Sequence, residues 1–292
     1  MHQLRTRFAP SPTGHLHVGN AYSALLCAQW AETNNAELLL RIEDIDFNRC
    51  RPEYAADLID DLRWLGLKWQ GDIRYQSGHL NEYAQALQSL KDDGLTYPCF
   101  CTRRDIQREI DISGLAPHLE DMPETYPGTC RSLSQSEREQ KIADGLPCAW
   151  RLNVQAALAR VGDLGWQDTD DDFHPVSRFL NDAVIGRKDI GFSYHLSVVV
   201  DDAAQGITHI IRGDDLISST GLHRLLQAVL NLPQPLYLHH GMLLDASGGR
   251  LAKRNGAPSL RKLRTSSVSA DTLRRLLSRN VGSAPMIWTG VE

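Results

Sequence analysis

The first residues that could do chemistry form a short turn near the start of the chain. His17 stands between Gly14 and Gly19, and residues 10–14 read PSPTG, a rigid turn of proline and glycine. A helix that begins after such a turn can hold a triphosphate on its backbone N–H groups, and an imidazole can donate to a phosphate oxygen. The pattern predicts a loop in which His17 can contact a nucleoside triphosphate. The alternative is a Pro/Gly loop that only caps a helix.

A second candidate set is basic and lies near the other end. Arg250 and Lys253 stand in the stretch RLAKR at residues 250–254, directly after Gly248 and Gly249. A cationic loop can close over a triphosphate and neutralise the charge that builds on departing pyrophosphate. Taken alone, such a stretch is more often a solvated basic surface. The same alternative holds for the arginine-rich residues that follow it.

Charged residues at the ends of apolar stretches are a third set. Glu43 closes the apolar run at residues 37–43, and Arg212 closes the run at residues 207–212. Ligands bind where parallel strands end, so both side chains are candidates for a substrate pocket. The alternatives are a surface turn for Glu43 and, for Arg212, an ion pair with a nearby carboxylate such as Asp214 or Asp215.

Three of the six cysteines form a candidate metal site. Cys99 and Cys101 are one residue apart, and Cys130 follows later in the chain. Disulfides are not expected in a cytoplasmic protein, so metal binding or plain burial is the better interpretation. Cys27 and Cys50 are expected to be buried apolar residues.

The elements that must position these residues alternate between strands and helices. A strand at residues 4–9, a helix at 20–34 and a strand at 37–43 make a βαβ unit, which predicts a parallel sheet. Further helices are expected at 51–65, 81–93, 220–231 (capped by Ser219 or Thr220) and 271–279. Periodicity alone does not assign residues 194–204 to helix or strand.

Composition limits the function classes. The 292 residues are 42% hydrophobic and 23% charged with a net charge of −5, which excludes a general basic coat for nucleic acid. No apolar run approaches the roughly 20 residues of a membrane span, and no signal peptide is recognisable. We therefore expect a soluble cytoplasmic protein with no membrane contact, acting as a monomer.

Four stretches together resemble a known family. RFAPSPTGHLHVGN at residues 7–20 and RLAKR at 250–254 resemble the HIGH and KMSKS signatures of class I aminoacyl-tRNA synthetases of the glutamyl type. RIEDID at 41–46 and the stretch 194–216 resemble the family's amino-acid pocket, and the resemblance covers about residues 4–262. Asn20 departs from the family's usual His or Gly, and Arg250 replaces the first Lys of KMSKS.

The resemblance implies ATP-dependent activation of L-glutamate to glutamyl-adenylate, with Mg²⁺ bridging the phosphates. His17 and Lys253 would be the catalytic residues, stabilising charge on the phosphates. Residues implied to contact ATP are His17, Gly19, Asn20, Arg250 and Lys253. Residues implied to bind glutamate are Arg7, Phe8, Ala9, Pro10, Ser11, Glu43, Tyr194 and Arg212. Two arginines suit a substrate with two carboxylates, and Glu43 would hold its ammonium group.

The family also places a Cys-x-Cys pair and a Tyr-x3-Cys group in the same region. By this resemblance Cys99, Cys101, Tyr126 and Cys130 would bind one structural Zn²⁺. Cys148 and His118 are alternative fourth ligands. The implied fold class is α/β, a class I synthetase Rossmann-like parallel sheet with a zinc-bearing insertion and a small C-terminal helical segment.

We expect four parts: the first half of the core at residues 1–96, the insertion at 97–189, the second half of the core at 190–240, and the KMSKS-like loop with a short tail at 241–292. Few residues follow that loop, too few for the family's anticodon-reading domains. Family members with this truncation attach glutamate to the queuosine base at the wobble position of tRNA(Asp), so queuosine-bearing tRNA(Asp) is the expected partner. The alternatives are a short synthetase that charges a tRNA 3′ end and a non-catalytic nucleotide-binding regulator. No residue can be assigned to reading queuosine.

Overall fold

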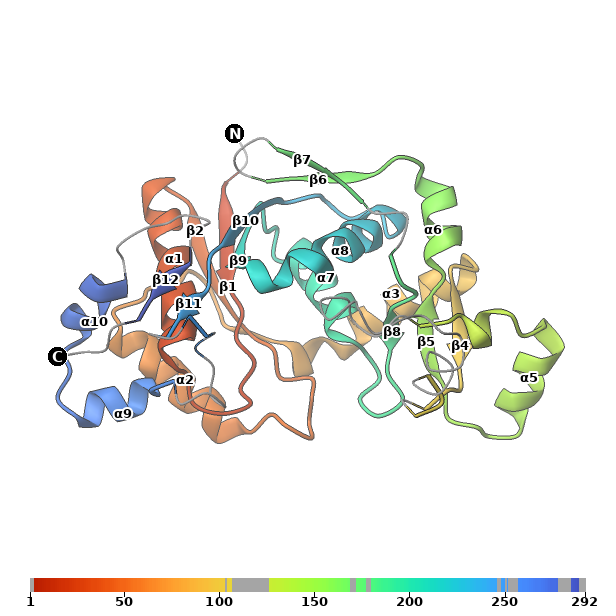
Figure 1. The fold of residues 1–292 in the computed structure, drawn as a ribbon, viewed down its shortest axis with the longest axis horizontal. Helices are drawn as coiled ribbons and strands as arrows, with labels where there is room; N and C mark the ends of the chain where they lie inside the picture. Colours follow the sequence, from red (N-terminus) through yellow and green to blue (C-terminus); the bar gives the residue numbers. More distant parts are fainter. Residues whose placement is uncertain are drawn as a thin grey trace.

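The βαβ unit that the sequence predicts is present, and a further helix and a short third strand extend it into the first half of the central sheet (Figure 1). β1 (Arg5–Phe8) pairs in parallel with β2 (Glu37–Ile42), and β2 pairs in parallel with β3 (Arg74–Tyr75). α1 (Val18–Thr33) joins β1 to β2, and α2 (Pro52–Trp64) joins β2 to β3. Pro52 occupies the first turn of α2, where its fixed φ suits a helix start.

The structure is a computed structural model that describes residues 3–102, 104–106, 126–168, 172–176, 180–245, 248–249, 251, 257–277 and 285–288. Among the helices in these ranges, none combines the length and the apolar character needed to cross a membrane.

The second half of the sheet lies beside the first. β9 (His209–Gly213) pairs in parallel with β10 (Leu236–His240). The N–H of Thr208 donates to the carbonyl of Arg5 at 3.0 Å, so the chain entering β9 lies against β1 (Figure 1). The short η3 turn (Asp214–Leu216) follows β9. Segments two hundred residues apart in sequence therefore meet at the centre of the molecule.

Two helices of this half add to the sequence prediction: one resolves a stretch that was left unassigned, and the other begins earlier than predicted. The ambiguous apolar stretch is a helix, α7 (Tyr194–Ala204), because the Ser193 hydroxyl caps its N-terminus by accepting the N–H of Leu196. α8 (Ile217–Val229) begins earlier than predicted, so neither Ser219 nor Thr220 is its cap. The hydroxyl of Thr220 instead accepts a bond from Arg212 in the interior.

An antiparallel sheet lies between the two halves in sequence. α3 (Leu80–Asp92) leads into β4 (Thr96–Cys99), which pairs with β5 (Ala149–Leu152), and β5 pairs with β8 (Val184–Gly186). The smaller elements of this region are η1 (Gln76–His79), η2 (Thr129–Arg131), α5 (Gln135–Ala143), α6 (Val154–Val161), β6 (Gly165–Gln167) and β7 (Phe173–Pro175). The change from parallel to antiparallel pairing is the basis on which we keep 97–189 as a proposed insertion.

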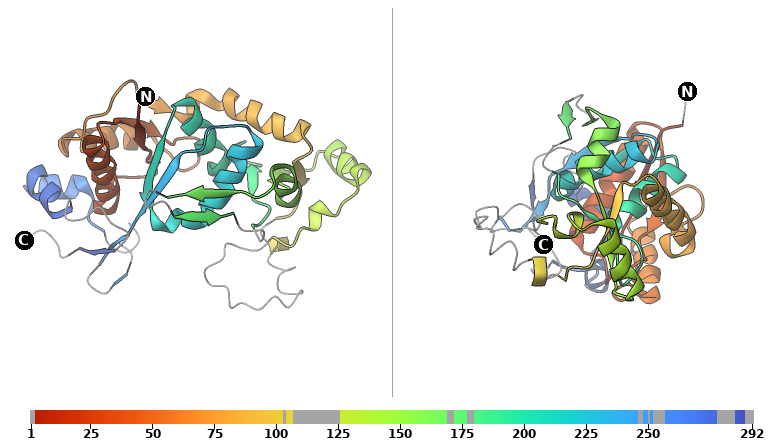
Figure 2. Two further views of the ribbon diagram at one scale, coloured as in Figure 1. Left: turned by 90° about the horizontal axis from the view of Figure 1, so that it is seen from above. Right: turned by 90° about the vertical axis from the view of Figure 1, so that its right-hand side faces the viewer.

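The C-terminal residues fold back onto the first half. β11 (Leu243–Leu244) pairs with β12 (Met286–Ile287), and α9 (Leu260–Thr265) and α10 (Ala270–Leu277) stand at the opposite end of the molecule from α5 (Figures 1 and 2). Leu260, Leu273 and Leu277 are fully buried in the same core as α1, β2 and α2. Burying a leucine contributes roughly 1.5–3 kcal/mol, which is enough to fix these short helices in place. Helices α9 and α10, which carry many of the basic residues of this region, are thus packed onto the core rather than forming a solvated end.

Candidate active site

One cleft of about 570 Å³ lies where β1, β2 and β9 end. Its size is typical of a small-molecule site. The predicted residues that line it are Arg7, Phe8, Ala9, Pro10, Ser11, His17, Gly19, Asn20, Glu43, Tyr194 and Arg212. Arg250 and Lys253 lie outside the described residues. Leu251, which stands between them, is buried and lines the same cleft.

His17 caps α1 at the floor of this cleft. Its Nδ1 accepts the N–H of Gly19 at 3.1 Å, and its own N–H donates to the side chain of Asn20 at 3.1 Å, which completes a capping box. Since Nδ1 is an acceptor, the ring carries its hydrogen on Nε2, the atom that can donate to a phosphate. Asn20 therefore has a structural reason to differ from the family pattern. A Cβ at Gly19 would lie 2.9 Å from the His17 ring, so only glycine fits there.

The flanks of the KMSKS-like loop are bonded to the loop that carries His17. The N–H of Val18 donates to the carbonyl of Pro258 at 3.2 Å, and the N–H of Leu260 donates to the carbonyl of Leu16 at 2.9 Å. His17 and Ser259 also form a β-bridge. The two signature segments, which are far apart in sequence, are therefore neighbours in space.

Buried carboxylates hold one of the two arginines. Arg7 donates from Nε to Asp202 at 2.9 Å, and the fully buried Arg41 donates to the same carboxylate oxygen at 2.8 Å. Arg41 also approaches Asp201 at 3.6 Å and Glu43 at 3.3 Å. Burial would raise the pKa of Asp202, but the two guanidinium groups hold it below its ordinary value. Asp202 is thus an ionised anchor for Arg7.

Glu43 lies in the same cleft, and the pKa of its carboxyl is raised whereas that of Asp202 is lowered. Burial raises the pKa of its carboxyl to about 7, against the opposing attraction of Arg41 and Arg7. The group therefore changes charge near neutral pH in the empty cleft. A bound ammonium group would favour its ionised form.

Arg212 has another set of partners. It donates from Nε to His239 at 3.2 Å, from Nη1 to His223 at 3.1 Å, and from Nη2 to Thr220 at 2.6 Å and to the carbonyl of Leu216 at 3.3 Å. The ion pair with Asp214 or Asp215, considered from the sequence, is not among the described contacts of Arg212.

Tyr194 is the first residue of α7 and lies beside two histidines. Its ring meets His195 and His223 edge to face, with centroids 5.5 and 5.7 Å apart. Burial is the main cause that raises the pKa of the phenol to about 12. The hydroxyl is therefore neutral and able to donate to a carboxylate.

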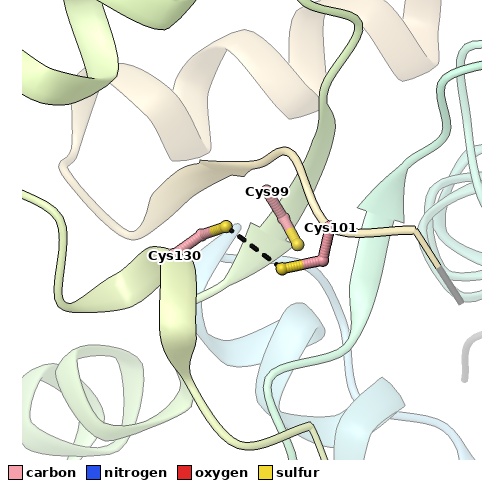
Figure 3. A group of neighbouring side chains, drawn as sticks. All are labelled: Cys99, Cys101 and Cys130. Carbon is pink, nitrogen blue, oxygen red and sulfur yellow. Dashed lines mark hydrogen bonds between the residues drawn. The ribbon is translucent and has the colours of Figure 1, made fainter. Parts of the chain in front are cut away.

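The three cysteines meet at the end of β4, beside η2 (Figure 3). Their sulfur atoms lie within 4.8 Å of one another, with Cys101 and Cys130 3.4 Å apart. The Tyr126 hydroxyl is 3.6 Å from the sulfur of Cys99 and 4.0 Å from that of Cys101. Ligands on a tetrahedral zinc ion with bonds of about 2.3 Å stand about 3.8 Å apart, so these four groups fit such an ion.

The hydrogen bond between two of these thiols shifts their pKa values in opposite directions. It lowers the pKa of Cys130 to about 6 and, together with burial, raises that of Cys99 to about 12, so Cys130 is the sulfur that ionises first. Cys148 is not in the described group of close sulfurs, and His118 lies outside the described residues. Cys27 and Cys50 are buried, as the sequence suggested.

Sequence reasoning missed the groups that hold the two arginines in place. The buried charge network around Arg7 consists of Asp201, Asp202 and Arg41. The histidines around Arg212 are His195, His223 and His239. The available signal was a pair of adjacent aspartates at the end of an apolar run, a pattern that a fully buried helix face would not contain without a charged partner.

Comparisons with known proteins identify related sequences and a related structure. The family profile described as "tRNA synthetases class I (E and Q), catalytic domain" matches residues 3–282. The "Glutamyl-Q tRNA(Asp) synthetase" of Rhodobacter capsulatus is 42% identical over 279 residues, which cover 93% of this chain and 99% of that protein. The "Glutamate--tRNA ligase" of Aquifex aeolicus is 37% identical over 279 residues, 94% of this chain and 56% of that protein. A crystal structure of a glutamate tRNA ligase from Elizabethkingia meningosepticum, in complex with its amino acid, superposes with a TM-score of 0.73 at 26% identity, over 87% of this chain and 53% of that one.

Proposed function

Because the chain belongs to the class I glutamyl- and glutaminyl-tRNA synthetases, through their catalytic domain, we propose that it activates glutamate with ATP and transfers it to the queuosine base at the wobble position of tRNA(Asp). One observation carries the glutamate part: a single cleft contains Arg7, Arg212 and Glu43 together with the His17 loop. The queuosine part is supported by the higher identity, 42% against 37%, to the relative that bears that name.

The reaction needs positioning and charge stabilisation rather than a protein nucleophile. The α-carboxylate of glutamate attacks the α-phosphate of ATP, and pyrophosphate leaves. Glu43 holds the substrate ammonium, and the guanidinium groups of Arg7 and Arg212 hold its carboxylates. His17 donates from Nε2 to a phosphate oxygen, and Lys253 neutralises the departing pyrophosphate, while Mg²⁺ accompanies ATP. A hydroxyl of the RNA then attacks the carbonyl carbon of the adenylate, the glutamyl ester forms, and AMP leaves.

We also propose one structural zinc ion. Cys99, Cys101, Cys130 and Tyr126 would hold it, and it would tie the loop after β4 to η2. In this role the ion stabilises the proposed insertion and takes no part in the reaction.

The test is transfer of radiolabelled glutamate to purified tRNA(Asp) with and without queuosine, followed by nuclease digestion to locate the label. We expect label on the queuosine nucleoside and none on queuosine-free tRNA. An Arg212→Gln variant serves as the matched control and should lose most of the transfer. Label on the 3′ adenosine of tRNA(Glu) would instead show a short tRNA-charging enzyme. No label, with no glutamate-dependent pyrophosphate exchange, would point to a non-catalytic nucleotide-binding protein.

A further inference from the structure

Arg212 makes many hydrogen bonds, and none of its described hydrogen-bond partners carries a negative charge. A guanidinium has five N–H groups, and four of those of Arg212 bond to His239, His223, Thr220 and the Leu216 carbonyl. All four acceptors are uncharged when the imidazoles are neutral. Arg212 itself is 6% exposed, so the side chain is held in one position inside the protein.

The hydrogen bonds fix the protonation of the histidines. His223 must accept from Arg212 at Nδ1, so its proton is on Nε2, which lies 3.0 Å from Nδ1 of His195. His195 therefore accepts in turn, and its own proton is on Nε2. A second proton on His223 would place an N–H against the guanidinium. Burial and, after it, the charge of Arg212 lower the pKa of His223 well below its ordinary value and that of His195 to about 4.

His239 completes the arrangement from the other side. Its Nε2 lies 3.2 Å from Nε of Arg212 and 3.1 Å from the Thr220 hydroxyl, so this nitrogen is also an acceptor. Burial, followed by the charge of Arg212, lowers the pKa of His239 to about 3. Imidazoles from α8 (His223) and β10 (His239) contact the guanidinium directly, and His195 of α7 bonds to the far side of the His223 ring.

The other arginine of the cleft is held differently. Arg7 is paired with the ionised carboxylate of Asp202 at 2.9 Å, which supplies its counter-ion within the protein. Arg212 has no carboxylate among its described contacts. A buried guanidinium without a counter-ion is unfavourable, and a ligand that brings a negative charge relieves that cost.

We propose that His223 and His239 are specificity-determining positioning residues, with His195 holding His223 in its tautomer: they fix Arg212 with neutral acceptors so that the side-chain carboxylate of the substrate becomes its counter-ion. This inference rests on the proposed function, in which the substrate is glutamate. The side-chain carboxylate stays charged through activation and transfer, so it can remain paired with Arg212 throughout. Glutamine would place a neutral amide there and leave the guanidinium unpaired, and it is thereby rejected.

Two variants of nearly equal shape separate charge from packing. In His223→Asn the amide oxygen stands where Nδ1 stood and remains a neutral acceptor, whereas His223→Asp supplies a carboxylate of the same size. We expect His223→Asp to raise the KM for glutamate by at least about tenfold over His223→Asn and to reduce the preference for glutamate over glutamine by a similar factor. The kcat should change by less than about threefold, because Arg212 is expected to hold a group that does not react.

The readouts are pyrophosphate exchange in the presence of tRNA, with glutamate or glutamine, and binding of glutamate alone by calorimetry. The KM for ATP and the melting temperature report on general damage. His239→Glu and His239→Gln form a second matched pair, which keeps the test possible if His223→Asp does not fold. Equal KM values and equal glutamate-to-glutamine ratios within both pairs, with an active wild type, would overturn the inference alone. A wild type that neither binds glutamate nor exchanges pyrophosphate would overturn the proposed function and the inference with it.

Discussion

Glu43 is the residue that we propose to hold the ammonium group of the substrate, so its charge state should control binding. Burial raises the pKa of its carboxyl to about 7, so the group is protonated in a growing fraction of molecules as the pH falls below that value. Only the carboxylate attracts the substrate amine. We expect kcat/KM for glutamate to fall about tenfold per pH unit below pH 7, measured by pyrophosphate exchange, while kcat/KM for ATP at saturating glutamate changes less.

The control is Glu43→Gln, which should have a low kcat/KM with no step near pH 7.

The same pKa shift also makes the stability of the folded protein depend on pH. Because the folded-state pKa of Glu43 is raised above its unfolded value, its favourable contribution is full at low pH and is lost as the pH rises through about 7. The melting temperature of Glu43→Gln relative to wild type should therefore increase between pH 5 and pH 8. A difference that stays constant over this range would contradict the assigned shift.

At the scale of elements, the cysteine cluster joins the end of β4 to η2 (Figure 3). We expect one zinc ion per chain by atomic emission, and Cys130→Ser to lose most of it and to lower the melting temperature by several degrees, about 2–4 °C for each kcal/mol lost. Cys148→Ala is the matched control, since Cys148 is a partly buried thiol outside the described cluster. Equal zinc content in the two variants would show that the cluster is not the metal site.

Local sequence rules predicted the elements whose signals are local. The alternating order of apolar strands and helices, the PSPTG turn and Pro52 together predicted β1, α1, β2 and α2. α7 could not be assigned because its three consecutive valines at 198–200 fit a strand as well as a helix, whereas the Ser193 cap marks a helix start.

The partners of the site arginines could not be predicted because they are distant in sequence. Arg7 and Asp202 are 195 residues apart, and Arg212 and His239 are 27 apart. Such pairs depend on the order of strands in the sheet, which no local pattern contains. The motifs indicated which residues line the cleft. The hydrogen-bond partners that set the charge of those residues could be found only from the three-dimensional structure.

At the scale of the whole molecule, an ion pair with a buried carboxylate helps to join the C-terminal segment to the first half of the chain. Arg264 of α9, whose side chain is 38% exposed, donates to Asp61 of α2 at 2.9 Å, and the side chain of Asp61 is only 2% exposed. A neighbouring pair, Arg261 with Asp57 at 3.0 Å, is 60% and 34% exposed. The two pairs join the same two helices and differ mainly in burial, so they form a natural comparison.

Arg264→Ala leaves the Asp61 carboxylate buried without its partner, so we expect it to lower the free energy of unfolding by about 1–3 kcal/mol. Arg261→Ala should cost less than about 0.5 kcal/mol, because water replaces the lost contact. Urea denaturation of both variants measures the difference. Adding Asp61→Asn to Arg264→Ala should recover about 1 kcal/mol, since the stranded charge is then removed. Equal losses in the free energy of unfolding for the two variants would mean that the buried leucines alone hold the C-terminal segment. Its basic residues would then be surface charges, which is the alternative that the sequence left open.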